Sequence, residues 1–210
     1  MRFAPEGRWF IVGAWVGVAA LAAAGVRAGA AVAAVLAVWV MWFFRDPERD
    51  WALGEDLILA PADGKVVSVG EVDEPSFLGG MAVRISIFMN VFDCHVNRYP
   101  VGGTVEYRFY NPGKFLNAAG DKASLDNEQA SLGLRGPRGP VLVRQIAGLV
   151  ARRIVTDARP SARCEQGARL GMIRFGSRVD VFLPVEQRAT PRVAEGDRVR
   201  AGVTILAEYP

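Results

Sequence analysis

The sequence predicts a mainly β domain that follows an N-terminal hairpin of two apolar helices. Between Trp9 and Phe44 lie 36 residues with a single charge, Arg27, near their middle. After Asp50 the chain changes to short runs of alternating apolar and polar residues, which are typical of strands. No helical periodicity of comparable strength recurs beyond the hairpin. With 51% hydrophobic residues among 210, the chain is too apolar to be largely disordered.

The apolar segment is predicted to form two short helices, at about 9–26 and 28–44, within a membrane anchor that covers residues 1–50. A bilayer core about 30 Å thick is crossed by about 20 helical residues, and about 17 is the lower limit. One continuous helix of 36 residues would overshoot that core. The two uncharged stretches therefore fit two spans that turn between Gly25 and Gly29.

Basic residues flank the hairpin at both ends, with Arg2 and Arg8 before it and Arg45 and Arg49 after it. The positive-inside rule then places both ends and the following domain in the cytoplasm, at the inner cell membrane. A secretory signal peptide is disfavoured, because its apolar region is normally only about 7–15 residues long. A hairpin that enters the bilayer without crossing it remains open.

The domain formed by residues 51–210 is predicted to be a barrel or sandwich of short strands. Gly, Pro and Asp residues separate the strands at short intervals, as in other all-β folds. Two segments, 61–67 and 193–206, look like the halves of a biotinyl/lipoyl-type barrel-sandwich module, and we expect that hybrid architecture. The expected strands are 65–72, 81–88, 104–110, 141–146, 152–156, 172–175, 179–183 and 203–208.

Several common chemistries are excluded by the motifs that they need. The chain has no P-loop, no glycine-rich dinucleotide fingerprint and no G-x-S-x-G elbow around a serine. One histidine and two distant cysteines, Cys94 and Cys164, cannot build a zinc site, so no metal is expected. The net charge of +3 is carried almost entirely by arginine, which is weak evidence for any partner, and nucleic acid is not implied.

Two polar positions stand out among the apolar strands. Asp63 lies in a Pro-Ala-Asp-Gly segment, where a turn-capping aspartate is the simpler interpretation. His95 lies in the polar segment Asp93–Arg98, directly after a strongly patterned strand. It is the only imidazole in the chain, which makes it the leading candidate for acid–base chemistry near neutral pH.

A Gly-Ser pair, Gly176 and Ser177, interrupts a further strand-like run. Such a pair usually marks a bulge or a close backbone approach. A strained turn there would also let the Ser177 hydroxyl attack the Gly176 carbonyl in an N-to-O acyl shift. The dipeptide alone does not distinguish these two interpretations.

Taken in order, seven segments closely resemble the short bacterial and archaeal form of phosphatidylserine decarboxylase. The resemblance implies an enzyme that cuts itself between Gly176 and Ser177 into a large chain, 1–176, and a small chain, 177–210, which stay associated. Ser177 would become a pyruvoyl group that holds the amine of a membrane phospholipid, phosphatidylserine, as a Schiff base while CO2 leaves; the product is phosphatidylethanolamine. The segments are 43–47, 61–64, 93–98, 111–115, 121–128, 145–154 and 171–180.

The resemblance also implies roles for individual polar residues. Asp63 and His95 match the aspartate and histidine that support self-cleavage and decarboxylation, and the division of labour between them stays open. Arg98 stands where the long form of the family has a second histidine. Candidates for binding the substrate headgroup are Arg98, Asn97 and Arg174.

Other interpretations stay open at this stage. Eight arginines between residues 141 and 178 form either a solvated face or a surface for anionic lipid headgroups. The same chemistry could serve archaetidylserine, and a homodimer is also left open. A non-catalytic adaptor or carrier on the barrel-sandwich fold is the rival from another class. A carrier needs a lysine at a hairpin tip, and Lys65, Lys114 and Lys122 lack that setting.

Overall fold

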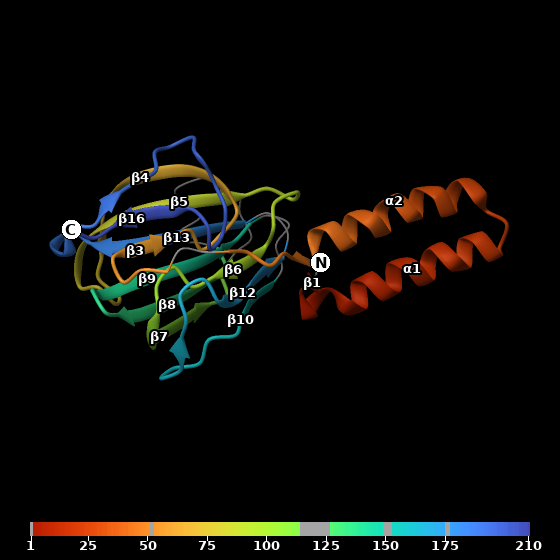
Figure 1. Cartoon of the computed structure of the whole chain (residues 1–210). Coiled ribbons are helices and arrows are strands. Elements are labelled where there is room, and N and C mark those ends of the chain that lie inside the picture. The colour runs from red at the N-terminus through yellow and green to blue at the C-terminus, as the bar shows by residue number, and fades with distance from the viewer. Residues whose placement is uncertain (1, 51–52, 114–126, 149–152, 175–176) are drawn as a thin grey trace. The chain divides into compact units, whose positions relative to one another are not determined.

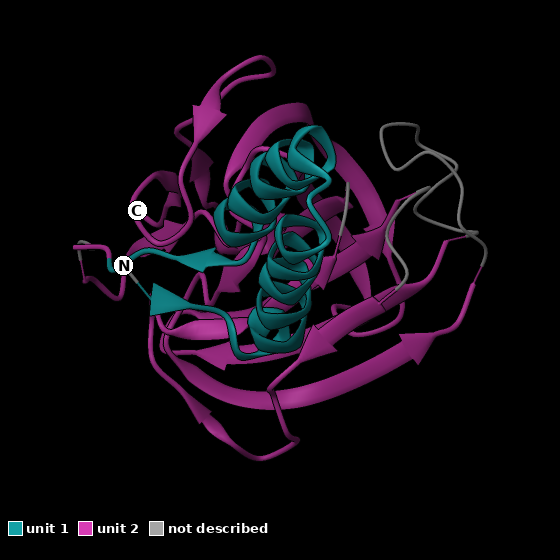
Figure 2. Cartoon of the chain, turned by 90° about the vertical axis from the view of Figure 1, so that its right-hand side faces the viewer, with its two compact units in different colours: residues 1–48 teal, residues 49–210 magenta. Residues whose placement is uncertain are grey.

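The computed structural model of the chain describes residues 2–50, 53–113, 127–148, 153–174 and 177–210. Its internal contacts divide the chain into two units, Met1–Glu48 and Arg49–Pro210, which Figure 2 colours separately. The first unit is helical and the second is built mainly of strands, so the predicted fold class is confirmed.

The N-terminal unit is a hairpin of two apolar helices that lie side by side and antiparallel (Figure 1). In the turn between them Gly25 has a φ of +75°, a left-handed conformation that favours glycine. A two-stranded antiparallel ladder joins the two ends of the hairpin. The elements are β1 (Arg2–Phe3), η1 (Pro5–Gly7), α1 (Arg8–Ala23), α2 (Arg27–Phe43) and β2 (Arg45–Asp46).

The helices of this unit leave large apolar side chains uncovered. Trp9 is 84% exposed and Val35 is 70% exposed. The helical stretch Pro5–Ala23 is long and apolar enough to cross a membrane, by length and composition alone, and Arg27–Phe43 is a shorter apolar helix. Exposed apolar surface of this extent is typical of a segment that meets lipid or another partner.

The larger unit is built from antiparallel strands, most of them short. One curled sheet contains eight strands in the order β11-β7-β8-β9-β13-β5-β4-β15, and two three-stranded sheets have the orders β10-β12-β6 and β14-β16-β3 (Figure 1). The elements are β3 (Leu57–Leu59), β4 (Gly64–Glu74), β5 (Gly80–Met89), β6 (Val96–Arg98), β7 (Gly103–Asn111), β8 (Gln129–Gly136), β9 (Gly139–Ala147), β10 (Arg153–Thr156), β11 (Arg163–Cys164), β12 (Arg169–Arg174), β13 (Ser177–Pro184), η2 (Val185–Gln187), β14 (Thr190–Pro191), β15 (Arg198–Val199) and β16 (Ile205–Glu208).

The main apolar core lies on one face of the curled sheet. On β13 the alternate residues Val179, Val181 and Leu183 belong to it, and on β5 Ile85 and Ile87 do so. This period of two is the one that the sequence shows, because successive side chains of a strand point to opposite faces. Each of the eight predicted strands accordingly overlaps an observed one.

Strand β8 was not predicted, although it is central to the curled sheet. Its sequence, QASLGLRG, contains no β-branched residue and shows no clean alternation, because six of its eight residues are buried. Gly133 within it is needed for packing: a Cβ there would lie 2.6 Å from the ring of Phe77. Residue propensity and alternation therefore do not identify this strand, which is covered on both faces.

Candidate active site

The predicted self-cleavage site lies where the chain passes from one sheet to another. Strand β12 of a three-stranded sheet ends at Arg174, and β13 of the curled sheet begins at Ser177. Gly176 lies outside the described residues. Ser177 therefore occupies the first position of a central strand, at the edge of the core.

The Ser177 side chain is fully buried on the core face of the curled sheet. Its register partners are Ala147 on β9 and Met89 on β5. Among the described residues its hydroxyl oxygen Oγ has no hydrogen-bond partner. An unpaired buried polar group costs about 1–3 kcal/mol, so in a native protein it is a candidate for a functional role.

His95 lies next to the segment that leads to Ser177. Its backbone carbonyl accepts a hydrogen bond of 3.3 Å from the amide of Ile173, four residues before Ser177. The ring is fully buried, and Nδ1 lies 3.1 Å from the carbonyl oxygen of Asp93. Because a carbonyl can only accept, Nδ1 carries the proton in this contact. Nε2 is then the nitrogen that can take up a proton.

Asp63 is held by two donors at the start of β4. One carboxylate oxygen accepts from Nη2 of Arg49 at 2.8 Å, and the other accepts from the amide of Ala201 at 2.8 Å. The next residue, Gly64, has a φ of +153° and approaches β5 so closely that a Cβ would lie 2.1 Å from the carbonyl oxygen of Phe88. Asp63 thus ties its turn to Arg49 and to the C-terminal segment.

A chain of buried polar side chains leads to Met89, the register partner of Ser177. Nε2 of Gln145 donates to Oδ1 of Asn97 at 2.7 Å, and the hydroxyl of Thr156 donates to Oε1 of Gln145 at 2.9 Å. Nδ2 of Asn97 in turn lies 3.7 Å from the sulfur of Met89, the register partner of Ser177. These contacts fix the orientation of both amides, which are fully buried.

Gln145 was not predicted as a site residue, although the strand pattern carries a signal for it. Val141, Val143 and Ala147 on β9 all belong to the apolar core, and Gln145 stands between them on the same face. A glutamine at a position where alternation demands an apolar residue needs buried hydrogen-bond partners. Such breaks in an alternating pattern could be searched for in other sequences.

The three predicted headgroup ligands lie in different surroundings. Asn97 belongs to the amide chain in the core, whereas the guanidinium of its neighbour Arg98 donates from Nη1 to the carbonyl of Gly167 at 3.1 Å. The amide of Arg98 also donates to the carbonyl of Pro61, which connects β6 to the turn of Asp63. Arg174 is partly exposed at the end of β12. The structure thus brings Asn97 into contact with Met89, the register partner of Ser177, whereas the Arg98 side chain bonds to Gly167.

A buried ion pair lies within the strand that begins at Ser177. Nε and Nη2 of Arg178 donate to the two carboxylate oxygens of Asp180, each at 2.8 Å, and both side chains are buried. Residues two apart on a strand share a face, so this pair lies on the face opposite to Ser177. The strand itself is held on both sides, because β13 pairs with β5 and with β9 from Ser177 onward.

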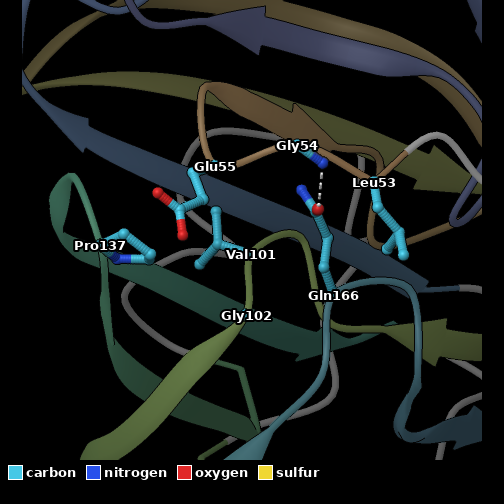
Figure 3. A pocket seen from close by; sticks show the side chains of 7 residues that line it. All are labelled: Leu53, Gly54, Glu55, Val101, Gly102, Pro137 and Gln166. Atoms are coloured by element: carbon cyan, nitrogen blue, oxygen red, sulfur yellow. Dashed lines mark hydrogen bonds between the residues drawn. The ribbon is translucent and has the colours of Figure 1, made fainter.

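One cavity of the larger unit lies far from Ser177. It has a volume of about 360 Å³ and is lined by residues from the β8–β9 turn and from the segment before β7 (Figure 3). In its wall the amide of Gly54 donates to Oε1 of Gln166 at 3.1 Å. The eight residues of β8 separate it from the Ser177 end of the sheet, a distance of about 25 Å. We therefore do not assign this cavity to the reaction.

Neither thiols nor clustered ligands suggest a metal centre in the described part of the chain. Cys94 and Cys164 are both buried and are not linked by a disulfide. Burial raises the pKa of the Cys164 thiol, which favours its neutral form. Among the described residues there is no group of three or more His, Cys, Asp or Glu side chains that could hold a metal ion.

Comparisons with known proteins agree with one another. The family model described as phosphatidylserine decarboxylase matches residues 36–207. A protein of Symbiobacterium thermophilum named phosphatidylserine decarboxylase proenzyme is 51% identical over 203 residues, which cover 96% of this chain and 94% of the relative. A protein of Azorhizobium caulinodans with the same name is 54% identical over 177 residues, which cover 83% of this chain and 75% of the relative.

Proposed function

The chain belongs to the phosphatidylserine decarboxylase family of carboxy-lyases, and on that basis we propose that it converts phosphatidylserine to phosphatidylethanolamine with a pyruvoyl group made from its own Ser177. The observation that carries the proposal is the buried hydroxyl of Ser177, which has no partner among the described residues, at the first position of β13. The word proenzyme in the names of both relatives supports processing of a precursor.

The surroundings of Ser177 fit a small group with a ketone. The register partner Ala147 is small, and the buried amides of Asn97 and Gln145, which reach Met89 on the other side of Ser177, would orient polar atoms of a ligand. A pyruvoyl group supplies a ketone that binds the amine of the substrate and accepts the electrons left by CO2. The pairing of β13 with β5 and β9, which begins at Ser177, would keep this position in the sheet after cleavage.

Processing needs a nucleophile and a base, and we assign them to Ser177 and His95. The Ser177 hydroxyl would attack the carbonyl of Gly176 while Nε2 of His95 takes the hydroxyl proton, and the peptide bond becomes an ester. Loss of the α-proton of Ser177 would then release the Gly176 carboxylate, and hydrolysis with loss of ammonia leaves the pyruvoyl group. The large chain thereby ends at Gly176.

We assign Asp63 a positioning role rather than a direct one. Both of its carboxylate oxygens already accept hydrogen bonds, from Arg49 and from the amide of Ala201. The turn that it holds is bonded through Pro61 to the amide of Arg98, three residues after His95. Asp63 would therefore act by fixing the segment that carries His95.

An intact-mass spectrum of the purified protein under denaturing conditions tests the proposed function. We expect two chains that break between Gly176 and Ser177, with the small chain lighter by one ammonia than a chain that begins with serine. Such a result would identify the cofactor and the class of enzyme together. A single chain of 210 residues that stays intact on incubation would contradict the proposal and favour a non-catalytic adaptor.

We further propose that the apolar hairpin holds the enzyme at the cytoplasmic face of the inner membrane, where its lipid substrate lies. The exposed apolar helices and the flanking arginines support this placement. The chain contains five tryptophans, and all of them lie within the first 51 residues. Tryptophan fluorescence of the unmodified protein therefore reports on the N-terminal region alone.

With phospholipid vesicles we expect tryptophan emission to shift to shorter wavelength and lipids brominated on their acyl chains to quench it. Trp9 in particular would move from water to the membrane interface, because it is 84% exposed. Vesicles with bromine at different depths would show whether the hairpin enters or crosses the bilayer. Emission that does not respond to vesicles would contradict membrane insertion of this segment.

A further inference from the structure

Glu128 is a buried carboxyl group that none of the assignments above uses. It directly precedes β8 and is only 4% exposed. Its backbone carbonyl accepts a hydrogen bond of 2.9 Å from the amide of Ala147 on β9. The register of β8 and β9 thus continues to this residue and sets Glu128 opposite Ala147.

Glu128 and Ser177 lie in one row across the curled sheet. Glu128 stands opposite Ala147, Ala147 pairs with Ser177, and Ser177 pairs with Met89. Residues in such a row share a face, and Ala147 and Met89 both belong to the apolar core, so all four side chains project into the core end where Ser177 lies. The residue between them in this row is alanine, so the sheet itself places only a methyl group between Glu128 and Ser177.

The two oxygens of the Glu128 carboxyl group differ in their contacts. Oε1 accepts a hydrogen bond of 2.8 Å from the hydroxyl of Tyr110 and lies 3.5 Å from the amide of Ile154. The hydrogen bond to Glu128 raises the pKa of Tyr110. Oε2 is buried and has no hydrogen-bond partner among the described residues. One oxygen is therefore held in place, while the other is left for a ligand.

A buried carboxylate is unfavourable without a cation, and Oε2 of Glu128 has no hydrogen-bond partner among the described residues. Arg153 on β10 is exposed, and its charge acts on Tyr110, whose hydroxyl donates to Oε1 of Glu128. The serine headgroup of the proposed substrate carries such a cation, its ammonium group. Chemistry at the Ser177 position requires this nitrogen as a neutral amine, because an ammonium has no lone pair with which to attack a ketone.

We propose that Glu128 binds the ammonium group of the substrate headgroup through Oε2 and takes one of its protons. The inference rests on the proposed function and adds a residue to it. One N–H bond breaks, one O–H bond forms on the carboxyl group, and the nitrogen keeps the electron pair with which it attacks. The same proton is available for the water that leaves when nitrogen replaces the ketone oxygen.

The spacing of the strands suits this role. Two strand spacings put the Cα atoms of Glu128 and Ser177 about 10 Å apart. The contacts of Oε1 with Tyr110 on β7 and with the amide of Ile154 on β10 fix one end of this span. The headgroup of the proposed substrate would bridge the rest of it, with its nitrogen in hydrogen-bond contact with Oε2 before it reaches the Ser177 position.

The test measures how the processed full-length enzyme and its Glu128→Gln variant react with two different amines. Phosphatidylserine in detergent micelles carries an ammonium group near neutral pH, whereas hydroxylamine is neutral there and attacks a ketone without losing a proton first. We expect kcat/KM for phosphatidylserine to fall about 100-fold, as on loss of a charged hydrogen bond in a buried site. The rate of inactivation by hydroxylamine and the two-chain mass pattern should match those of the wild type.

The pH dependence of kcat/KM distinguishes this role from a purely structural one. The deficit of Glu128→Gln should shrink as the pH rises, because the substrate amine then loses its proton to water. Glu128→Asp, which keeps the carboxylate, should lose less activity. Glu106→Gln is the matched control: Glu106 is exposed on β7 and paired with Arg135, and this variant should behave as the wild type.

Three results would overturn the assignment of Glu128. They are an unchanged kcat/KM, an equal loss with both amines at every pH, and a variant that stays in one chain, since processing involves no ammonium group. A wild-type small chain that does not react with hydroxylamine would instead overturn the proposed function itself, and the role of Glu128 with it.

Discussion

Ser177→Ala is expected to leave one uncut chain of 210 residues with no decarboxylase activity. The substitution removes the only atom that we assign as nucleophile, and without cleavage no pyruvoyl group forms. It keeps the Cβ atom and therefore the packing against Ala147 and Met89. Because the lost hydroxyl is buried and has no partner among the described residues, the free energy of unfolding should stay constant or rise by about 1 kcal/mol.

Ser86→Ala is the matched control for this variant. Ser86 lies on the neighbouring strand β5, is 1% exposed and likewise has a hydroxyl without a partner in the described part of the chain. The same change there should leave cleavage and activity intact. The measurements are intact mass, CO2 release from phosphatidylserine and thermal unfolding. Cleavage or normal turnover by Ser177→Ala would end the pyruvoyl proposal.

His95→Gln is expected to slow both the appearance of the small chain and the decarboxylation by the cleaved fraction. General acid–base catalysis contributes about 100-fold to 10,000-fold, and glutamine keeps the polarity of the side chain without a titrating nitrogen. Glutamine carries its amide nitrogen near the position of Nε2 and not of Nδ1, so the hydrogen bond to the carbonyl of Asp93 is lost and the free energy of unfolding should fall by about 1 kcal/mol. A time course of the precursor after rapid purification measures cleavage. Rates equal to those of the wild type in both steps would show that His95 is structural.

Asp63→Asn separates the role of Asp63 from that of His95. Asparagine can still accept from the amide of Ala201, but it removes the negative charge beside Arg49, whose side chain is only 5% exposed. Breaking a buried ion pair costs about 3 kcal/mol, so we expect a lower melting temperature. Replacing Arg49 by Met in the same chain should recover part of that loss. Abolished cleavage with unchanged stability would instead identify Asp63 as a direct base.

Much of the fold was accessible from local patterns. The patterns along 81–88 and 179–183 predict strands, and β5 and β13 confirm both. On β5 the alternating residues Ile85 and Ile87 belong to the core, whereas Met81 on the same face is 49% exposed. The uncharged stretches on either side of Arg27 predict the helical hairpin. Strand β8 was not predicted, because burial on both faces removes the alternation of apolar and polar residues. Gln145 was not predicted as a site residue, because the sequence does not show which distant side chains form hydrogen bonds with it.

The candidate site was predictable only in part. His95 stands out by composition, and Ser177 follows from the order of the segments that resemble the family. The hydrogen bonds that hold Asp63 could not be predicted from the sequence, because its partner Ala201 lies 138 residues away. Glu128 and Ser177 are likewise far apart in the chain and share a row only because β8, β9 and β13 are neighbours in the curled sheet.

The sequence by itself determined the two-part organisation, the mainly β class and the residues that can carry the chemistry, because hydrophobic periodicity and residue type are local properties of a chain. Only the tertiary structure decided which side chains meet. It joined Asn97 to Gln145 and to Met89, the register partner of Ser177, bonded Arg98 to Gly167 and put Glu128 in the same row as the serine. Strand order and register arise from contacts between distant segments, and a shift of one residue would send every side chain of a strand to the other face.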